Sequence, residues 1–268
     1  MYDTLRPELL TATTEQQQLM EVDPTAVVEC GMFFSNQFPY LEVRKPFIIG
    51  TAEEKWKATP SHWFLRLLHD KQKLLRLYTQ NIDGLDLQVG IPNEKIINVH
   101  GTIGSISCEN CGVEYPRDDF MNKLKSNIKD IYGIDETAPK ESKNILCLKC
   151  EQPTVKPSTV LYGSSLPSNF FTCVEEDFPD NVDLLLVIGT SLTVYPAAGL
   201  VDRVSPTCRR VLVNRDNVVS PFGSLGVFGK QKIEQNRNYF LKGNCDEVIE
   251  KLVNALGWKE DFNNLLPK

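Results

Sequence analysis

Short apolar runs that end in polar residues or glycine mark the expected strands of this chain. Residues 182–188 (VDLLLVI) form a nearly continuous apolar run that ends at Gly189, and residues 210–214 repeat the pattern. Runs of this kind are typical of parallel strands that are buried on both faces. Residues 74–78 and 238–242 predict two further short strands.

Helical signals lie between these runs. Pro60 follows Thr59 at the start of a segment with a broad apolar face, as is typical of the first turn of a helix. Residues 246–256 carry an apolar stripe at helical spacing, and residues 5–60 predict helices and loops without a strong strand. Strands that alternate with helices predict an α/β fold, here a Rossmann-like open parallel sheet whose ligands bind beyond the carboxyl ends of the strands.

The character of the chain changes between residues 102 and 155. Apolar residues become sparser there, Lys and Asp are mixed, and residues 119–129 predict a helix. We therefore expect a small inserted module at 102–155 and a main domain made of residues 1–101 and 156–268.

Composition and charge limit the function classes. The 268 residues are 41% hydrophobic, which is enough for a sizeable core, and 29 basic against 35 acidic residues give a net charge of -6. This balance argues against non-specific nucleic-acid binding but is compatible with basic peptides as ligands. The chain has no long apolar run, and residues 1–10 do not resemble a leader, so we expect neither a transmembrane helix nor a secretory signal.

The cysteines point to a metal site. Four of the eight form two Cys-x-x-Cys pairs, Cys108 with Cys111 and Cys147 with Cys150. In a chain without a secretory signal, four such thiolates predict one tetrahedral structural Zn²⁺ site that is closed to chemistry. Disulfides or free thiols are the alternatives, and a zinc ribbon that binds nucleic acid is a competing function, although the intervening residues form no basic stripe. The remaining cysteines are expected to be free thiols: Cys30, Cys173, Cys208 and Cys245.

Polar groups follow three of the expected strands, at 80–83, at 189–191 and at Asn214. Glycine lets the backbone approach a ligand, and the hydroxyl and N–H groups suit phosphate or ribose oxygens. Helix capping and ordinary turns are the alternatives, but three polar strand ends together favour one nucleotide crevice. His100 lies between the first of these strand ends and the first cysteine pair, and an imidazole there is a candidate general base.

In this order, the motifs resemble those of the sirtuin family of NAD-dependent protein lysine deacylases, over nearly the whole chain from Tyr2 to Trp258. The motifs that carry the resemblance are Thr79-Gln80-Asn81-Ile82-Asp83, His100-Gly101, the two cysteine pairs, Lys156-Pro157 with Val160 to Gly163, Gly189-Thr190-Ser191-Leu192, Val194 with Pro196-Ala197-Ala198, Asn214-Arg215-Asp216 and Gly243-Asn244-Cys245-Asp246.

The resemblance implies a protein deacetylase that moves the acetyl group of acetyl-lysine to the ADP-ribose part of NAD and releases nicotinamide. His100 would be the general base, and Asn81 would position ribose or water. The implied cofactor-binding residues are Gln80, Asn81, Ile82, Asp83, Gly189, Thr190, Ser191, Asn214, Arg215, Asp216 and the backbone of Cys245. Substrate peptide would add as a strand along Val160, Leu161, Tyr162 and Gly163.

The same resemblance implies NAD and one structural Zn²⁺ per chain, acetylated proteins or peptides as partners with histones among them, and a nuclear or cytoplasmic location. The charge balance and the lack of a basic stripe predict no direct nucleic-acid partner, and the lack of a long apolar run predicts no membrane partner. The alternative function is a catalytically impaired relative that serves as a peptide-binding or interaction module.

The chain also departs from the family pattern. It lacks the first buried strand, the Gly-Ala-Gly-x-Ser turn and the Gly-Ile-Pro-Asp-Phe-Arg segment. That strand normally lies between the strand ending at Thr79 and the one ending at Ile188, so we expect two unpaired strand edges and exposed apolar surface. We expect a truncated chain rather than a degenerate one, because the other motifs are intact. Ser158, Tyr162 and Ser164 replace the usual Asp, Phe and Glu, which puts the peptide preference in doubt.

Overall fold

The computed structural model describes residues 4–218 and 237–267. The chain divides into two compact units, the first with residues 1–56, 81–84 and 100–166 and the second with residues 57–80, 85–99 and 167–268. The predicted α/β fold with parallel strands is confirmed. The predicted module at 102–155 lies within the first unit, and its functional separation from the rest stays a proposal.

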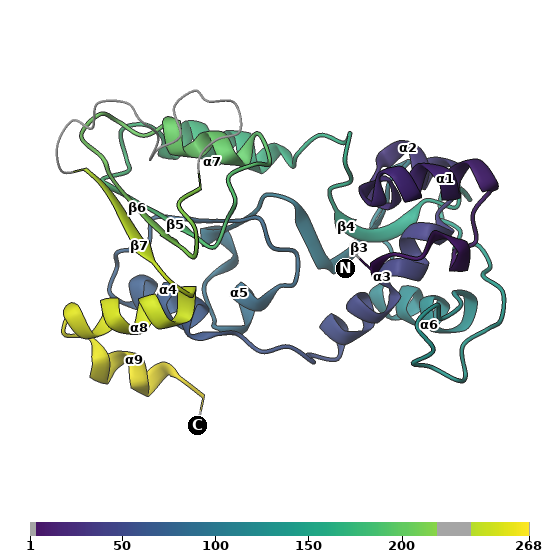
Figure 1. Ribbon diagram of the computed structural model, residues 1–268, viewed down its shortest axis with the longest axis horizontal. Coiled ribbons are helices and arrows are strands. Elements are labelled where there is room, and N and C mark those ends of the chain that lie inside the picture. Colours follow the sequence, from purple (N-terminus) through teal and green to yellow (C-terminus); the bar gives the residue numbers. More distant parts are fainter. Residues whose placement is uncertain (1–3, 219–236, 268) are drawn as a thin grey trace. The chain divides into compact units, whose positions relative to one another are not determined.

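The first unit consists of helices and an antiparallel pair of strands (Figure 1). Its elements, in which η marks a 3-10 helix, are η2 (Pro7–Leu9), α1 (Thr14–Val22), η3 (Pro24–Val28), α2 (Cys30–Ser35), α3 (Phe38–Ala52), β3 (Gly101–Cys108), α6 (Arg117–Asn127) and β4 (Val155–Thr159). Helix α1 begins with a capping box, since Thr13 accepts a bond from the Gln16 N–H and Gln16 accepts one from the Thr13 N–H. Two backbone donors that the first turn cannot satisfy internally are thereby paired.

One hydrophobic core joins the helices before residue 57 to the predicted module. Its fully buried members come from both parts of the sequence and include Phe33, Leu41, Val43, Phe120, Leu124, Ile128, Ile145 and Val155. At about 25 cal/mol for each Å² of apolar surface removed from water, burying several such side chains is the main force that holds the module in place.

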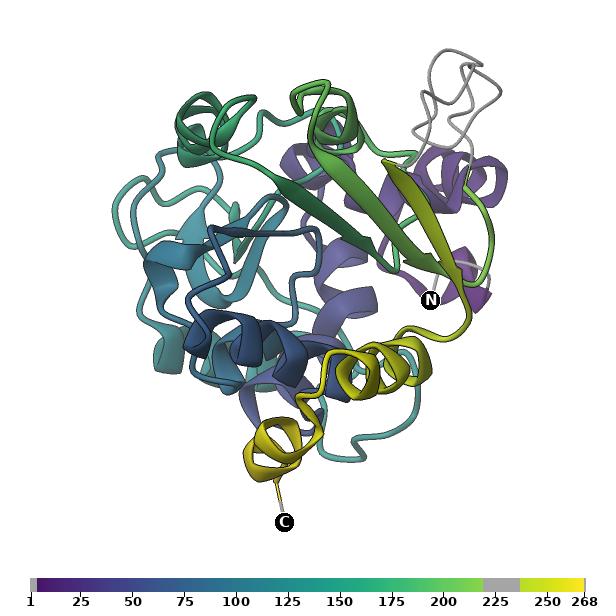
Figure 2. The ribbon, with the colours of Figure 1, turned by 90° about the vertical axis from the view of Figure 1, so that its left-hand side faces the viewer.

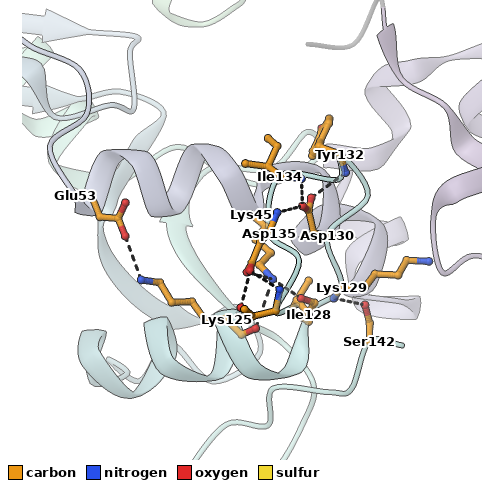
Figure 3. Close-up of polar contacts among 11 residues, drawn as sticks. Lys45, Glu53, Lys125, Ile128, Lys129, Asp130, Tyr132, Ile134, Asp135 and Ser142 are labelled. Atoms are coloured by element: carbon orange, nitrogen blue, oxygen red, sulfur yellow. Dashed lines mark hydrogen bonds and ion pairs between the residues drawn. The ribbon is translucent and has the colours of Figure 1, made fainter. Parts of the chain in front are cut away.

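Two buried charged side chains of α3 add directional contacts to this packing. Lys45 is 3% exposed and donates a hydrogen bond of 2.6 Å to the carbonyl oxygen of Ile128, which directly follows α6 (Figure 3). Glu42 is fully buried and accepts bonds from the Ser142 hydroxyl at 2.5 Å and the Thr11 N–H at 2.8 Å. Because buried charges are stable only with partners, these bonds fix the loop after α6 against α3.

The antiparallel pair β3 and β4 places Gly101 opposite Thr159. Gly101 has a φ of +75°, and a Cβ added there would lie 2.0 Å from the carbonyl oxygen of Ser158. Only glycine fits such a close approach in the left-handed region. The close approach of β4 therefore explains why glycine follows His100 in the sequence.

The second unit contains two parallel sheets and the helices that cover them (Figure 1). Its elements are α4 (Pro60–Asp70), β1 (Leu77–Thr79), α5 (Leu85–Gln88), η4 (Asn93–Lys95), β2 (Ile96–Asn98), α7 (Ser168–Asp177), β5 (Leu184–Ile188), η5 (Ala197–Asp202), β6 (Arg209–Asn214), β7 (Asn238–Lys242), α8 (Cys245–Ala255) and α9 (Lys259–Leu265). Strand β1 pairs with β2, and the strands β5, β6 and β7 form a separate sheet in that order, side by side in Figure 2. The strands predicted from the apolar runs are all present, although β1 begins three residues later than the run at 74–78.

Strand β5 is less buried than the sequence predicts. Val187 is its one buried residue, and Leu184 is 48% exposed. The reason lies in the pairing, because among the described residues β6 is the sole strand neighbour of β5 and β2 is the sole strand neighbour of β1. Within the described residues, the expected break between the strand that ends at Thr79 and the strand that ends at Ile188 is therefore present.

Helices α4, α8 and α9 pack together in the second unit around Phe64, Leu67, Ile249, Val253 and Phe262. Asp246, in the first turn of α8, also caps α4. It accepts bonds from the Ser61 N–H at 2.9 Å, from the Ser61 hydroxyl at 2.6 Å and from the Thr59 hydroxyl at 3.0 Å. A carboxylate at a helix N-terminus pairs free N–H groups and favours the helix dipole.

Candidate functional site

The four paired cysteines converge into one cluster. Their sulfur atoms all lie within 4.8 Å of one another, with Cys108 to Cys150 at 3.6 Å and Cys111 to Cys147 at 3.7 Å. A tetrahedral zinc site with Zn–S bonds of about 2.3 Å separates its sulfurs by about 3.8 Å, so the cluster fits one Zn²⁺. All eight cysteines are free thiols, and no disulfide joins them.

The local backbone closes a turn at each cysteine pair and favours the thiolate of Cys150. A turn closes each pair in the same way, with the Gly112 N–H bonding to the Cys108 carbonyl at 2.9 Å and the Glu151 N–H to the Cys147 carbonyl at 3.1 Å. The N–H of Gln152 is the main cause that lowers the pKa of Cys150 to about 6. The N–H dipole of Gln152 therefore favours the thiolate of Cys150, which is the form that binds metal.

His100 is joined to the expected peptide segment through the main chain. The N–H of Val160 donates a hydrogen bond of 2.9 Å to the carbonyl oxygen of His100. The bond continues the pairing of β3 with β4 by one residue, since Gly101 lies opposite Thr159. The candidate base and the start of the segment 160–163 are therefore held together by backbone atoms, with His100 half-buried.

The segment 160–163 has one edge in use. Tyr162 donates its N–H to the carbonyl of Val28 at 3.0 Å and accepts a bond from the N–H of Cys30 at 2.9 Å, as in a parallel strand pair. Among the described residues, no hydrogen bond involves the carbonyl of Val160 or the N–H of Gly163. Unbonded backbone groups of this kind are the ones that an added strand uses.

Asn81, Ile82 and Asp83 also belong to the first unit. The carbonyl of Ile82 accepts a bond of 3.0 Å from the N–H of Ile103, which fixes this short stretch beside β3. Asn81 is exposed, whereas Ile82 and Asp83 are half-buried. The stretch therefore has a defined backbone next to the strand that begins directly after His100.

The predicted cofactor residues of the second unit gather at the carboxyl ends of β1, β5 and β6. Thr190 is their centre: its hydroxyl accepts a bond from the Gln80 amide at 3.2 Å, and its carbonyl accepts one from the Asn214 amide at 3.0 Å. Gly189 has a φ of +62°, and a Cβ there would lie 3.3 Å from the sulfur of Cys245. Three strand ends expected to act together are thus in direct contact.

Further members of this cluster lie at its exposed rim. Arg215 donates a bond of 2.7 Å to the side chain of Asn244, directly before α8. Ser191 and Asp216 are exposed. Polar groups on glycine-containing strand ends, beside a helix N-terminus, suit phosphate and ribose oxygens.

Sequence reasoning missed Glu109, which lies inside the first cysteine pair. Its carboxylate bonds to the ammonium group of Lys156 at 2.8 Å and to the hydroxyl of Ser164 at 3.2 Å. Lys156 is 1% exposed, and burial lowers its pKa while Glu109 works against that shift. The available signal was a charged residue placed between two candidate metal-binding cysteines, but its partners are remote in sequence.

The comparisons with known proteins agree with these features. Residues 12–196 match the family model described as Sir2 family. The chain is 35% identical over 245 residues to NAD-dependent protein deacetylase sirtuin-3 of Mus musculus, covering 91% of this chain and 64% of that protein. It is 34% identical over 245 residues to NAD-dependent protein deacetylase hst2 of Schizosaccharomyces pombe, covering 90% of this chain and 63% of that protein.

A third relative is NAD-dependent protein deacetylase sirtuin-2 of Danio rerio, 33% identical over 253 residues, with 91% of this chain and 61% of that protein covered. The chain thus spans somewhat less than two thirds of the length of these relatives. Within the part of the chain that the structure describes, no helix combines the length and the hydropathy needed to cross a membrane.

Proposed function

Because the chain belongs to the Sir2 family, we propose that it is an NAD-dependent protein lysine deacetylase. The proposed reaction moves the acetyl group of acetyl-lysine to the ADP-ribose part of NAD, with release of nicotinamide. The observation that carries the proposal is the backbone bond between His100 and Val160, because it joins the proposed base to the proposed peptide-binding segment.

In the first unit, the proposed general base is the imidazole of His100, which would accept a proton from a ribose hydroxyl. Asn81 would position ribose or water, and Ile82 and Asp83 would hold the carboxamide of the nicotinamide. The peptide would add as a strand along the segment 160–163. This is supported by the carbonyl of Val160 and the N–H of Gly163, which have no bond among the described residues.

In the second unit, the proposed binding residues for NAD are those around Thr190. When bound there, NAD would supply the acceptor for the acetyl group. Gly189, Thr190 and Ser191 would contact phosphate and ribose, Gln80 would contact ribose, and the adenosine end would meet Asn214, Arg215, Asp216 and the backbone of Cys245. The contacts of Thr190 with Gln80 and Asn214 support one shared site for these side chains.

The proposed metal is one structural Zn²⁺ per chain, held by Cys108, Cys111, Cys147 and Cys150. Four thiolates fill a tetrahedral shell and leave no position for a reacting water, so its role would be to stabilise the fold. We assign residues 102–155 to this zinc-binding module and residues 1–101 and 156–268 to the NAD-binding catalytic domain.

The proposed substrates are acetylated proteins or peptides, with histones among them, and not nucleic acid or membrane lipid. A nuclear or cytoplasmic location is proposed as well, in keeping with eight cysteines that remain free thiols. No observation favours the alternative of a catalytically impaired interaction module.

The test is release of nicotinamide from NAD by the purified chain in the presence of an acetyl-lysine peptide. Release should depend on the acetyl group of the peptide, should disappear in His100→Ala, and should persist in His69→Ala, a substitution of another half-buried histidine in the second unit. A zinc-loaded, folded chain that releases no nicotinamide would contradict the proposed function.

A further inference from the structure

Glu109 lies in the loop between two proposed metal ligands, yet its contacts lie outside that loop. Its N–H donates a bond of 2.8 Å to the carbonyl of Thr154. One carboxylate oxygen bonds to the ammonium group of Lys156 at 2.8 Å, and the other accepts a bond from the hydroxyl of Ser164 at 3.2 Å. Glu109 therefore links the cysteine loop to β4 and to the residue that follows the segment 160–163.

Lys156 extends this link into the segment. Its ammonium group is 1% exposed and also donates bonds to the carbonyl of Thr159 at 2.5 Å and to the carbonyl of Pro157 at 3.2 Å. Within the described residues, Glu109 is the one carboxylate paired with this ammonium group. A buried ammonium group that loses its only carboxylate is strongly destabilised, so the contacts of Lys156 depend on Glu109.

These contacts hold both ends of the segment 160–163. At its start, Lys156 holds the carbonyl of Thr159, and the Val160 N–H bonds to the His100 carbonyl. At its end, Glu109 holds Ser164, whose N–H closes a turn onto the carbonyl of Leu161 at 3.0 Å. The free carbonyl and N–H groups between these points keep one orientation only while both ends are held.

We propose that Glu109 is a positioning residue that couples the cysteine metal site to the peptide-binding segment, acting through Lys156 and Ser164. Its carboxylate sets the conformation in which the segment accepts a substrate strand, and the chemical step does not use it. The part of this inference that concerns peptide affinity rests on the proposed function. The part that concerns the order of the segment does not.

The test compares Glu109→Gln, which removes the charge at nearly the same size, with Glu114→Gln, an exposed glutamate of the same module. Four quantities are measured for each zinc-loaded protein: the amide hydrogen exchange of residues 160–164, the KM for an acetyl-lysine peptide, the KM for NAD, and kcat. Ser164→Ala removes only the hydrogen bond between Ser164 and Glu109 and leaves the ion pair of Glu109 and Lys156 intact.

Because the charge-assisted bond between Glu109 and Lys156 is lost, Glu109→Gln should speed exchange at residues 160–164 and raise the peptide KM about tenfold. The kcat and the KM for NAD should stay nearly unchanged. Ser164→Ala should also speed exchange and raise the peptide KM, each by a smaller factor. A variant that combines Glu109→Gln with Ser164→Ala should resemble Glu109→Gln alone, because both substitutions interrupt the same chain of contacts through Glu109. Glu114→Gln should behave as the unsubstituted chain.

A zinc-loaded Glu109→Gln protein with unchanged exchange at residues 160–164 would overturn the inference, as would a loss of kcat without a change in the peptide KM. If Glu109→Gln releases zinc, the inference is tested with Ser164→Ala instead. Unchanged exchange at residues 160–164 in Ser164→Ala would then overturn it. If the unsubstituted chain shows no turnover, the proposed function fails, and the exchange comparison alone decides whether Glu109 positions the segment.

Discussion

The carbonyl oxygen of His100 accepts a hydrogen bond of 2.9 Å from the backbone N–H of Val160. The residue proposed as general base and the segment proposed to bind peptide are thus joined without the use of either side chain. The bond exists because β3 and β4 pair with Gly101 opposite Thr159, which brings the residues next to that pair into register. Substitutions can therefore separate the chemical role of the imidazole from the structural role of the backbone.

We predict that His100→Ala and Val160→Pro fail in different ways. His100→Ala keeps the backbone bond, so peptide affinity should change little while turnover falls about 10²-fold or more, the range for loss of a general base. Val160→Pro removes the N–H that makes the bond and should weaken peptide binding. Peptide dissociation constants from fluorescence anisotropy, together with rates of nicotinamide release, would check both, and similar peptide affinities in the two variants would contradict the prediction.

Two glycines of the first unit offer a matched pair for stability. Both have positive φ, but a Cβ at Gly101 would lie 2.0 Å from a carbonyl oxygen, whereas Gly133 has nothing within 4 Å. Gly133→Ala should cost about 1 kcal/mol from backbone strain alone, and Gly101→Ala should cost more than about 3 kcal/mol because the strands must also separate. Urea unfolding would measure the difference, and equal costs would show that the clash is relieved without separation of the strands.

The cysteine cluster predicts a defined response to loss of one ligand. Cys147→Ser should bring the zinc content from about one per chain to well below one and expose the apolar residues that pack around the cluster, because structural zinc contributes directly to folding. Cys208→Ser, a buried free thiol outside the cluster, should keep the metal. Elemental analysis with limited proteolysis of residues 102–155 would test this, and full zinc occupancy in Cys147→Ser would rule out a four-cysteine site.

Asp246 predicts a pH-dependent part of the stability of the second unit. Burial works to raise its pKa, but bonds from Ser61 and Thr59 outweigh burial and hold that pKa below the usual value. A carboxyl group whose pKa is lowered by folding stabilises the fold above its unfolded pKa, near about 4, and loses this contribution as pH falls through its folded pKa.

Asp246→Asn should therefore lower stability by about 1–2 kcal/mol at pH 7, and the difference from the unsubstituted chain should shrink below about pH 4. Glu250→Gln, an exposed position on the same helix, should have little effect at any pH. Thermal unfolding followed from pH 7 to pH 3 would show the trend, and a difference that persists unchanged at pH 3 would mean that charge is not the cause.

Several parts of the fold follow from local sequence. Strand β7 has the predicted bounds 238–242, and α4 begins at the predicted Pro60, because alternation, helical periodicity and capping are set by neighbouring residues. The cysteine pairs and His100-Gly101 could also be recognised in the sequence, since the proposed zinc site and the proposed general base require particular residue types at fixed spacing. The fold class and the two cysteine pairs that cluster in the fold could therefore be predicted from the order of the residues alone.

Other features were decided only by the tertiary structure, because they depend on contacts between residues that are remote in sequence. The bond of Ser164 to Glu109 spans 55 positions, and no local pattern marks the two residues as partners. The burial of β5 is a second case, because five apolar residues predict a strand but its neighbours decide how much of it is covered. Sequence determined which elements and which chemical groups this protein has, since these depend on local propensity and residue type. Packing decided which groups meet, since burial and pairing are properties of the whole fold.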